Sequence, residues 1–110
     1  MSLNIYPVTL ELAREVARLL PAIAAADPDL ARQLRRAVTS VALNVGEGMY
    51  SQGRNRTARY HTAMGSAREA QSCLEVSHAM GYASPISNDM RTRLNHIIGT
   101  LVRLVRPRPV

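Results

Sequence analysis

The chain has 110 residues, enough for one hydrophobic core and too few for two. Hydrophobic residues make up 46% of it, which argues against disorder, and the absence of phenylalanine and tryptophan favours aliphatic side chains packed between helices over a β-sandwich. A formal net charge of +6 and an isoelectric point near 10.7 favour a polyanionic partner, with nucleic acid first and an acidic protein or lipid surface second.

An Asp-Pro boundary separates the first two predicted helices. The first is expected from Thr9 to about Ala26, with Thr9 as its N-cap and a bend at Pro21. Asp27 then caps a second helix from Pro28 to roughly Met49, since proline is favoured at the first helical position. Each helix has one apolar stripe of helical period. These stripes are Leu12, Val16, Leu19, Leu20 and Ile23, and then Leu30, Leu34, Ala37, Val38, Val41 and Val45.

Two more helices follow after a turn at residues 51–53. The third is expected from about Arg54 to Met80, and Gly81 is the natural residue to end it. Ser84-Pro85 or Ser87 opens the last helix, which Pro107 stops. Their stripes are Ala63, Ala67, Ala70 and Leu74, and then Ile86, Met90, Leu94, Ile97, Ile98, Leu101 and Val105.

Four amphipathic helices with short connections predict the fold class. We expect an all-α fold, an antiparallel up-and-down four-helix bundle that forms a single domain over residues 1–110. The N-terminal residues lack the basic region and apolar core of a secretory signal, and no apolar stretch approaches the roughly 20 residues that span a bilayer. A cytoplasmic protein without membrane contact is therefore expected.

Few residues in the sequence are typical of an enzyme. Glu75 and His78 form an E-x-x-H pair, which di-iron four-helix bundles contain twice, but neither His61 nor His96 follows a glutamate at this spacing. The single cysteine, Cys73, has no disulfide partner and no histidine on its side of the helix, so a small core residue is expected. We predict a protein that is not an enzyme and needs no cofactor or metal, with a di-metal oxidase as the least favoured alternative.

The arginines are the stronger signal. A guanidinium group offers phosphate two hydrogen-bond donors at once, so clustered arginines are typical of nucleic-acid backbone binding. A solvated charged face is the alternative interpretation. Tyr50 and Tyr60 are either stacking platforms for unpaired bases or buried side chains. The predicted nucleic-acid-binding residues are Arg32, Arg35 and Arg36 on the second helix, and Arg54, Arg56 and Arg59 on the third.

Glycines interrupt the helical pattern where the second and third helices face each other. Gly46 and Gly48 lie near the end of one helix and Gly65 in the middle of the other, although glycine costs about 1 kcal/mol in a helix. In a hairpin turning near Gln52, Gly65 lies opposite Ser40, so small residues there are expected to allow close backbone approach. Four polar residues are predicted to bond within the bundle or face a neighbouring subunit: Asn44, Glu47, Ser66 and Glu69.

The same segments resemble a known family. RRAVTSVALNVGEG, at residues 35–48, and ARYHTAMGSAREAQSCLEVSHAMGY, at residues 58–82, are similar to the four-helix bundle protein family. That family includes proteins encoded in intervening sequences of bacterial large-subunit ribosomal RNA genes and the accessory variability determinant of diversity-generating retroelements. Ala42, Gly46 and Met80 stand where the family usually has proline, alanine and leucine. The matching positions are Arg35, Arg36, Ala37, Ser40, Val41, Asn44, Val45, Glu47, Gly48, Gly65, Ser66, Glu69, Gly81 and Tyr82.

The resemblance implies an assembly and a class of ligand. It implies a ring-shaped homopentamer of four-helix bundles whose basic surface binds RNA or DNA. In the retroelement branch it implies a reverse transcriptase as partner. A symmetric scaffold that recruits an acidic protein is the alternative, and the physiological ligand is left open.

Overall fold

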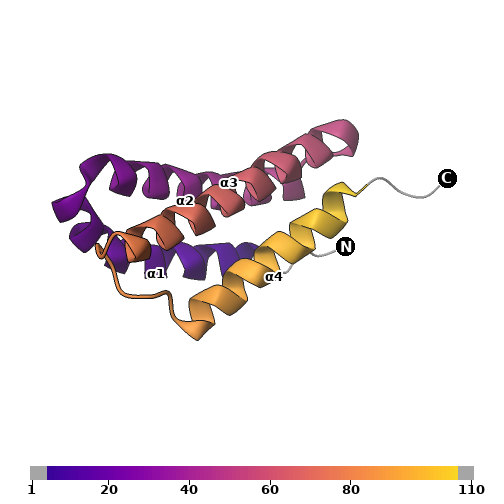
Figure 1. Ribbon diagram of the computed structural model, residues 1–110. Coiled ribbons are helices and arrows are strands. Elements are labelled where there is room, and N and C mark those ends of the chain that lie inside the picture. The colour runs from indigo at the N-terminus through magenta and orange to yellow at the C-terminus, as the bar shows by residue number, and fades with distance from the viewer. Residues whose placement is uncertain (1–4, 107–110) are drawn as a thin grey trace.

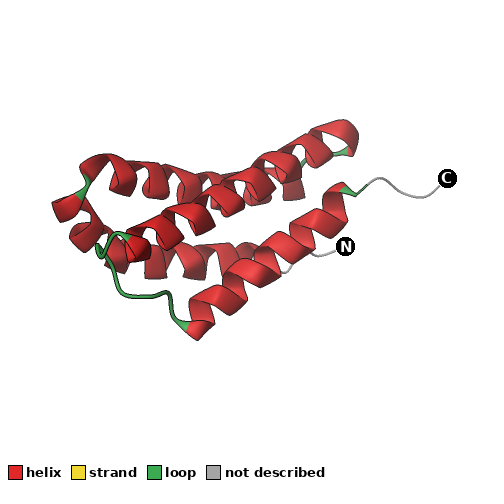
Figure 2. Cartoon of the chain, viewed as in Figure 1, coloured by secondary structure: helices red, strands yellow, loops and turns green. Residues whose placement is uncertain are grey.

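The computed structural model describes residues 5–106 as four α-helices with short connections. They are α1 (Ile5–Ala26), α2 (Pro28–Met49), α3 (Gly53–Ala79) and α4 (Asn88–Val105). Each helix packs against the next along the chain, α4 packs against α1, and the α2–α3 contact is the most extensive (Figures 1 and 2). The predicted all-α, antiparallel up-and-down four-helix bundle is therefore confirmed. It is elongated, with principal extents of 48 × 23 × 22 Å.

The first helix starts one turn earlier than the sequence indicates. Thr9 is buried inside α1, and its hydroxyl donates to the Tyr6 carbonyl at 2.6 Å, so it does not act as an N-cap. The helix also continues through Pro21 to the expected end at Ala26. Pro21 and Ala17 are both exposed, so the Ala17 carbonyl that proline leaves unpaired faces water. Burial of the neighbouring Ile23 holds the last turn against the bundle.

The remaining boundaries follow the capping residues. The Asp27 carboxylate accepts a hydrogen bond from the Leu30 amide at 3.0 Å, as expected for its N-cap role. Of the two candidate starts for α4, Ser87 is the cap, and its hydroxyl accepts from the Met90 amide at 3.0 Å. Gly81, just past α3, adopts the left-handed φ of +79° that favours glycine. The expected stop at Pro107 lies outside the described residues.

The core consists almost wholly of the predicted stripes. The α3 stripe contains three fully buried alanines, Ala63, Ala67 and Ala70, which let α2 and α3 approach closely. Cys73 is confirmed as a core residue. Burial, with a smaller contribution from the Glu69 charge, raises the pKa of its thiol and keeps the thiol protonated. The stripe residues only partly buried lie at the margin: Leu19, Leu20, Leu30, Ile86, Ile98 and Val105.

The close approach allowed by glycine occurs at Gly48, and the expectation for Gly65 is wrong. A Cβ on Gly48 would lie 2.4 Å from a ring carbon of Tyr60, which packs on the α2 backbone there. A Cβ on Gly46 would lie 3.1 Å from the ring of Tyr6. A Cβ on Gly65 would meet no atom within 4 Å, because Gly65 lies on the exposed side of α3 while its neighbour Ser66 faces α2.

An ion pair links the first and last helices. Nη1 of Arg93, on α4, contacts Oε1 of Glu15, on α1. The two side chains are only 29% and 17% exposed, respectively, so both charges are substantially shielded from water. Shielding makes the loss of either partner costly, because the other charge would remain in a poorly hydrated place.

Candidate nucleic-acid interface

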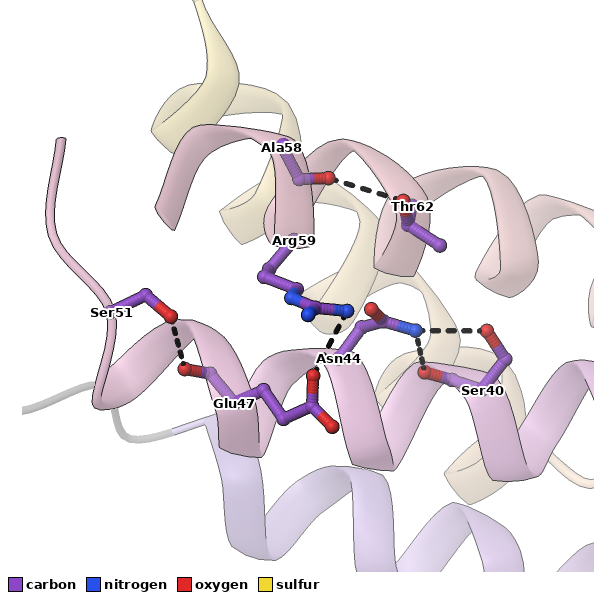
Figure 3. A network of polar contacts seen from close by, with 7 residues as sticks. All are labelled: Ser40, Asn44, Glu47, Ser51, Ala58, Arg59 and Thr62. Atoms are coloured by element: carbon purple, nitrogen blue, oxygen red, sulfur yellow. Dashed lines mark hydrogen bonds and ion pairs between the residues drawn. The ribbon is translucent and has the colours of Figure 1, made fainter. Parts of the chain in front are cut away.

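A hydrogen bond between two small polar side chains joins the middle of α2 to the middle of α3. The Ser40 and Ser66 hydroxyl oxygens lie 2.7 Å apart across the two helices. The Asn44 side-chain amide donates to the Ser40 carbonyl at 2.9 Å and to the Ser40 hydroxyl oxygen at 3.1 Å (Figure 3). The hydrogen-bond donors of the Asn44 side chain therefore find their acceptors one turn back on the same helix. The Ser40–Ser66 contact places these two positions opposite each other in the hairpin.

Two contacts made by carboxylates extend this line toward both ends of the hairpin. Glu69 accepts a hydrogen bond from the Gln33 amide at 3.2 Å. Nearer the turn, Arg59 Nη1 lies 2.9 Å from an oxygen of Glu47, as the dashed line in Figure 3 marks. Both contacts are exposed, so each is expected to contribute no more than about 1 kcal/mol. The four predicted polar residues all lie along or beside the α2–α3 contact.

The structure separates the six predicted arginines into two groups. Arg32, Arg35 and Arg36 lie in the first half of α2, whereas Arg54, Arg56 and Arg59 lie in the first two turns of α3. Because a helix rises about 1.5 Å per residue, Arg36 lies roughly 20 Å from the α2–α3 turn. The first group is therefore near the middle and far end of the hairpin, and only the second group is at its tip.

Members of the two groups differ in how far their charge is already neutralised. Arg32 pairs with Asp29 at 2.8 Å one turn away, and Arg59 pairs with Glu47. Arg35, Arg36 and Arg54 are exposed, and their guanidinium groups make no ion pair or hydrogen bond within residues 5–106. Arg56 is also exposed and forms no ion pair there, but it donates hydrogen bonds.

Arg56 has a structural role that the sequence pattern did not reveal. Its Nε donates to the Ser51 carbonyl at 2.8 Å and to the Gly48 carbonyl at 3.2 Å. Carbonyls at a helix C-terminus lack intrahelical donors and carry partial negative charge, so a guanidinium group there stabilises the end of α2. The terminal nitrogens of Arg56 make no hydrogen bond among the described residues.

Replacing Arg56 by alanine is expected to destabilise the protein by about 1 kcal/mol, because the carbonyls at the end of α2 lose a charged donor. Arg54→Ala removes the same charge from the same turn and is expected to change the stability by less than about 0.5 kcal/mol. Urea unfolding followed by far-UV circular dichroism measures both. Equal midpoints for the two variants would show that the Arg56 hydrogen bonds do not contribute.

A groove lies beside the tip of the hairpin. Its volume is about 510 Å³, and its lining comes from the start of α1, the last two turns of α2, residues 50 and 51 of the turn and Arg59 of α3. Tyr50 lines it and is 89% exposed, whereas Tyr60 is only 5% exposed in the core. The sequence pattern alone does not distinguish these two tyrosines and does not predict the groove. The available signal was Gly46, whose missing side chain leaves room for Tyr6 of α1.

Other candidate sites have less structural support. Glu75 and His78 are both exposed on α3, and no group of three or more potential metal ligands occurs in the part of the chain that the structure describes. Across residues 5–106, none of the helices has the length and apolar character that a bilayer span requires.

The fold and these surfaces define a class: a small, arginine-rich, antiparallel four-helix bundle whose most extensive helix contact is the α2–α3 hairpin. The chain belongs to the family described as 23S rRNA-intervening sequence protein, whose family model matches residues 1–103. This confirms the family that the sequence motifs resemble. No curated protein matches the chain.

A solved structure supports the fold independently. It is a crystal structure described as a protein with unknown function from the S23 ribosomal protein family of Bacteroides thetaiotaomicron VPI-5482. Its TM-score with this chain is 0.75 at 19% sequence identity, and the match covers 94% of this chain and 99% of that chain. At this identity the likeness concerns the fold alone.

Proposed function

We propose that this protein binds the phosphate backbone of a nucleic acid through the arginines of the α2–α3 hairpin, with little reading of base sequence and without catalysing a reaction. The observation that carries the proposal is the exposure of Arg35, Arg36 and Arg54 without a carboxylate partner among the described residues. The net charge of +6 supports it, because most guanidinium groups in residues 5–106 form no ion pair with a carboxylate there. The family description makes RNA the first polymer to test.

The paired arginines also contribute to this surface. Arg32 and Arg59 form exposed ion pairs, and exposed pairs contribute only about 0–1 kcal/mol. A phosphate group can therefore compete for them. The two arginine groups lie roughly 20 Å apart, which corresponds to about six phosphates along one strand of a duplex at 3.4 Å each. A duplex would contact both groups only by lying along the hairpin.

Binding is expected to weaken steeply with salt, because phosphate contacts release counterions. Fluorescence anisotropy with labelled single- and double-stranded RNA and DNA, between about 50 and 200 mM salt, measures the slope of log affinity against log salt. The combined replacement of Arg35, Arg36 and Arg54 by alanine is expected to reduce this slope by about 2 to 3.

The matched control removes the same charge from the other face. Arg18, on α1, and Arg91 and Arg103, on α4, are exposed, so their combined replacement by alanine leaves the net charge equal to that of the first variant. An equal loss of affinity in both variants would assign binding to net charge and not to the hairpin. Affinity that does not depend on salt, or no binding at low salt, would overturn the proposal.

The family resemblance adds two finer proposals. The first is that the protein assembles as a homopentamer, and the second is that a reverse transcriptase is its partner if the chain belongs to the retroelement branch. Light scattering coupled to size-exclusion chromatography gives the mass of the assembly, and a monomer mass would contradict the first. Copurification with a reverse transcriptase encoded by an adjacent gene tests the second proposal. Elution of the two proteins in separate peaks would contradict it.

A second candidate function is a symmetric scaffold that recruits a protein. Val76, in the last turn of α3, and Met80, its C-cap, favour it, because they lie four residues apart and are 48% and 60% exposed. Large apolar side chains exposed together are typical of interaction surfaces. One protein partner that survives nuclease treatment and is lost when both residues are replaced by serine would favour this function over the first.

A further inference from the structure

Resting on the proposed function, we propose that the tip of the α2–α3 hairpin is specific for single-stranded nucleic acid. An unpaired base stacks on Tyr50 beside the groove, and the adjacent phosphate is held by Arg54 and the terminal nitrogens of Arg56. This assigns the tip a ligand with two features, a free aromatic face and a neighbouring negative charge.

The first observation is the position of Tyr50. Its side chain is 89% exposed, although a tyrosine ring normally packs against other apolar groups. Its backbone is nevertheless held in place as the C-cap of α2, with its amide donating to the Glu47 carbonyl at 3.1 Å. A ring on a rigid support loses little freedom when it stacks, which lowers the cost of binding.

The second observation is the groove next to this ring. Its 510 Å³ is within the range of small-molecule sites, and its lining combines apolar side chains with the Glu47–Arg59 pair at one side. Leu43 lines it and is itself an exposed apolar side chain, and Gly46 contributes only backbone. A flat apolar group such as a nucleobase, placed next to Tyr50, would therefore bury apolar surface that is now in contact with water.

The third observation is the sign of the charge around the tip. Between Glu47 and Glu69 the chain contains no aspartate or glutamate, while it contains four arginines, of which Arg54, Arg56 and Arg59 lie in the first two turns of α3 and Arg68 lies farther along it. Glu47 and Arg59 neutralise each other, which leaves Arg54 and Arg56 as the positive charges next to the turn. The surroundings of Tyr50 therefore favour an aromatic group that carries a phosphate over a neutral or cationic aromatic group.

These observations favour a single strand over a duplex. In a duplex both faces of each base are covered by neighbouring bases, so an exposed ring has nothing to stack on without unstacking them. In a single strand a base is free to rotate onto Tyr50, and such stacking is sequence-tolerant because every base has an aromatic face. The arginines alone would bind both forms.

The test compares Tyr50→Ala with Tyr50→Phe on a labelled single-stranded RNA and on the duplex of the same sequence. Tyr50→Ala is expected to weaken single-strand binding by about 5- to 150-fold and duplex binding by less than about 2-fold. Tyr50→Phe keeps the ring and is expected to retain single-strand binding. Met80→Ala is the matched control, because Met80 is an exposed apolar residue that caps the far end of α3, away from the α2–α3 turn.

A second readout reports stacking directly. The chain has no tryptophan, so Tyr50→Trp introduces a single tryptophan at the tip that can be excited apart from the remaining tyrosines, and its emission is expected to be quenched by single strands and much less by duplex. If Tyr50→Ala weakens both forms equally or neither, the inference is overturned while backbone binding by the arginines stands. If the wild-type protein binds neither form at low salt, the proposed function and this inference fail together.

Discussion

Replacing Gly48 by alanine is expected to destabilise the protein by about 2 kcal/mol, whereas the same replacement at Gly65 is expected to stabilise it by up to about 1 kcal/mol. At Gly48 the added methyl group would lie 2.4, 2.8 and 3.0 Å from three ring carbons of Tyr60. The ring is buried, so it has no free space into which to move. At Gly65 the methyl group meets nothing, and alanine's better helix propensity is the main effect.

Chemical denaturation of the two variants measures the change in the free energy of unfolding, which is expected to be a loss for Gly48→Ala and a gain for Gly65→Ala. A third variant combines Gly48→Ala with Tyr60→Leu, which removes the ring that causes the clash. In the Tyr60→Leu background, Gly48→Ala is expected to lower the free energy of unfolding by less than it does in the wild type. If Gly48→Ala is as stable as the wild type, the packing of Tyr60 on the α2 backbone is not as described. A destabilised Gly65→Ala would instead reveal a contact with a second molecule at the exposed side of α3.

Replacing Arg93 by alanine is expected to cost about 2 kcal/mol, because it leaves the Glu15 carboxylate largely buried and without its partner. The cost stays below the 3–5 kcal/mol typical of fully buried pairs, because Arg93 is 29% exposed and water reaches part of the site. Removing both partners together avoids an uncompensated charge, so the double variant is expected to be more stable than the sum of the single losses indicates.

A double-mutant cycle with Glu15→Ala and Arg93→Ala measures this coupling, which we expect to be about 1–2 kcal/mol. The exposed Arg14–Glu11 pair within α1 serves as the control, and its coupling is expected to be no more than about 0.5 kcal/mol. Equal coupling in the two cycles would mean that shielding from water does not strengthen the α1–α4 pair.

Much of the fold could be predicted from the sequence because helix formation here depends on local signals. Asp27-Pro28 marks the start of α2, and the apolar stripes identify the buried sides of all four helices. The start of α1 was predicted a turn too late, because Thr9 resembles a cap in sequence. Its hydroxyl bonds back to the Tyr6 carbonyl only because the helix already exists there, and that could not be read from the residue itself.

The candidate site was predictable in composition but not in arrangement. The sequence identified the arginines, yet whether a guanidinium group meets a carboxylate depends on tertiary packing, as the Arg59–Glu47 contact illustrates. The sequence likewise identified glycines that face a neighbouring helix but assigned the close approach to Gly65. A single residue is about 100° of helix rotation, so Ser66 faces α2 and Gly65 faces outward. The same uncertainty left Tyr50 and Tyr60 undistinguished.

The connection between α3 and α4, residues 80–87, lies at the opposite end of the bundle from the α2–α3 turn, as Figure 1 shows. Ser84 is exposed there, while Cys73 is buried with a thiol whose pKa is raised. A maleimide dye would therefore couple selectively to a Ser84→Cys variant without removal of the native thiol. A dye at position 84 would therefore report binding at the α2–α3 turn from the opposite end of the bundle, where it does not obstruct the proposed site.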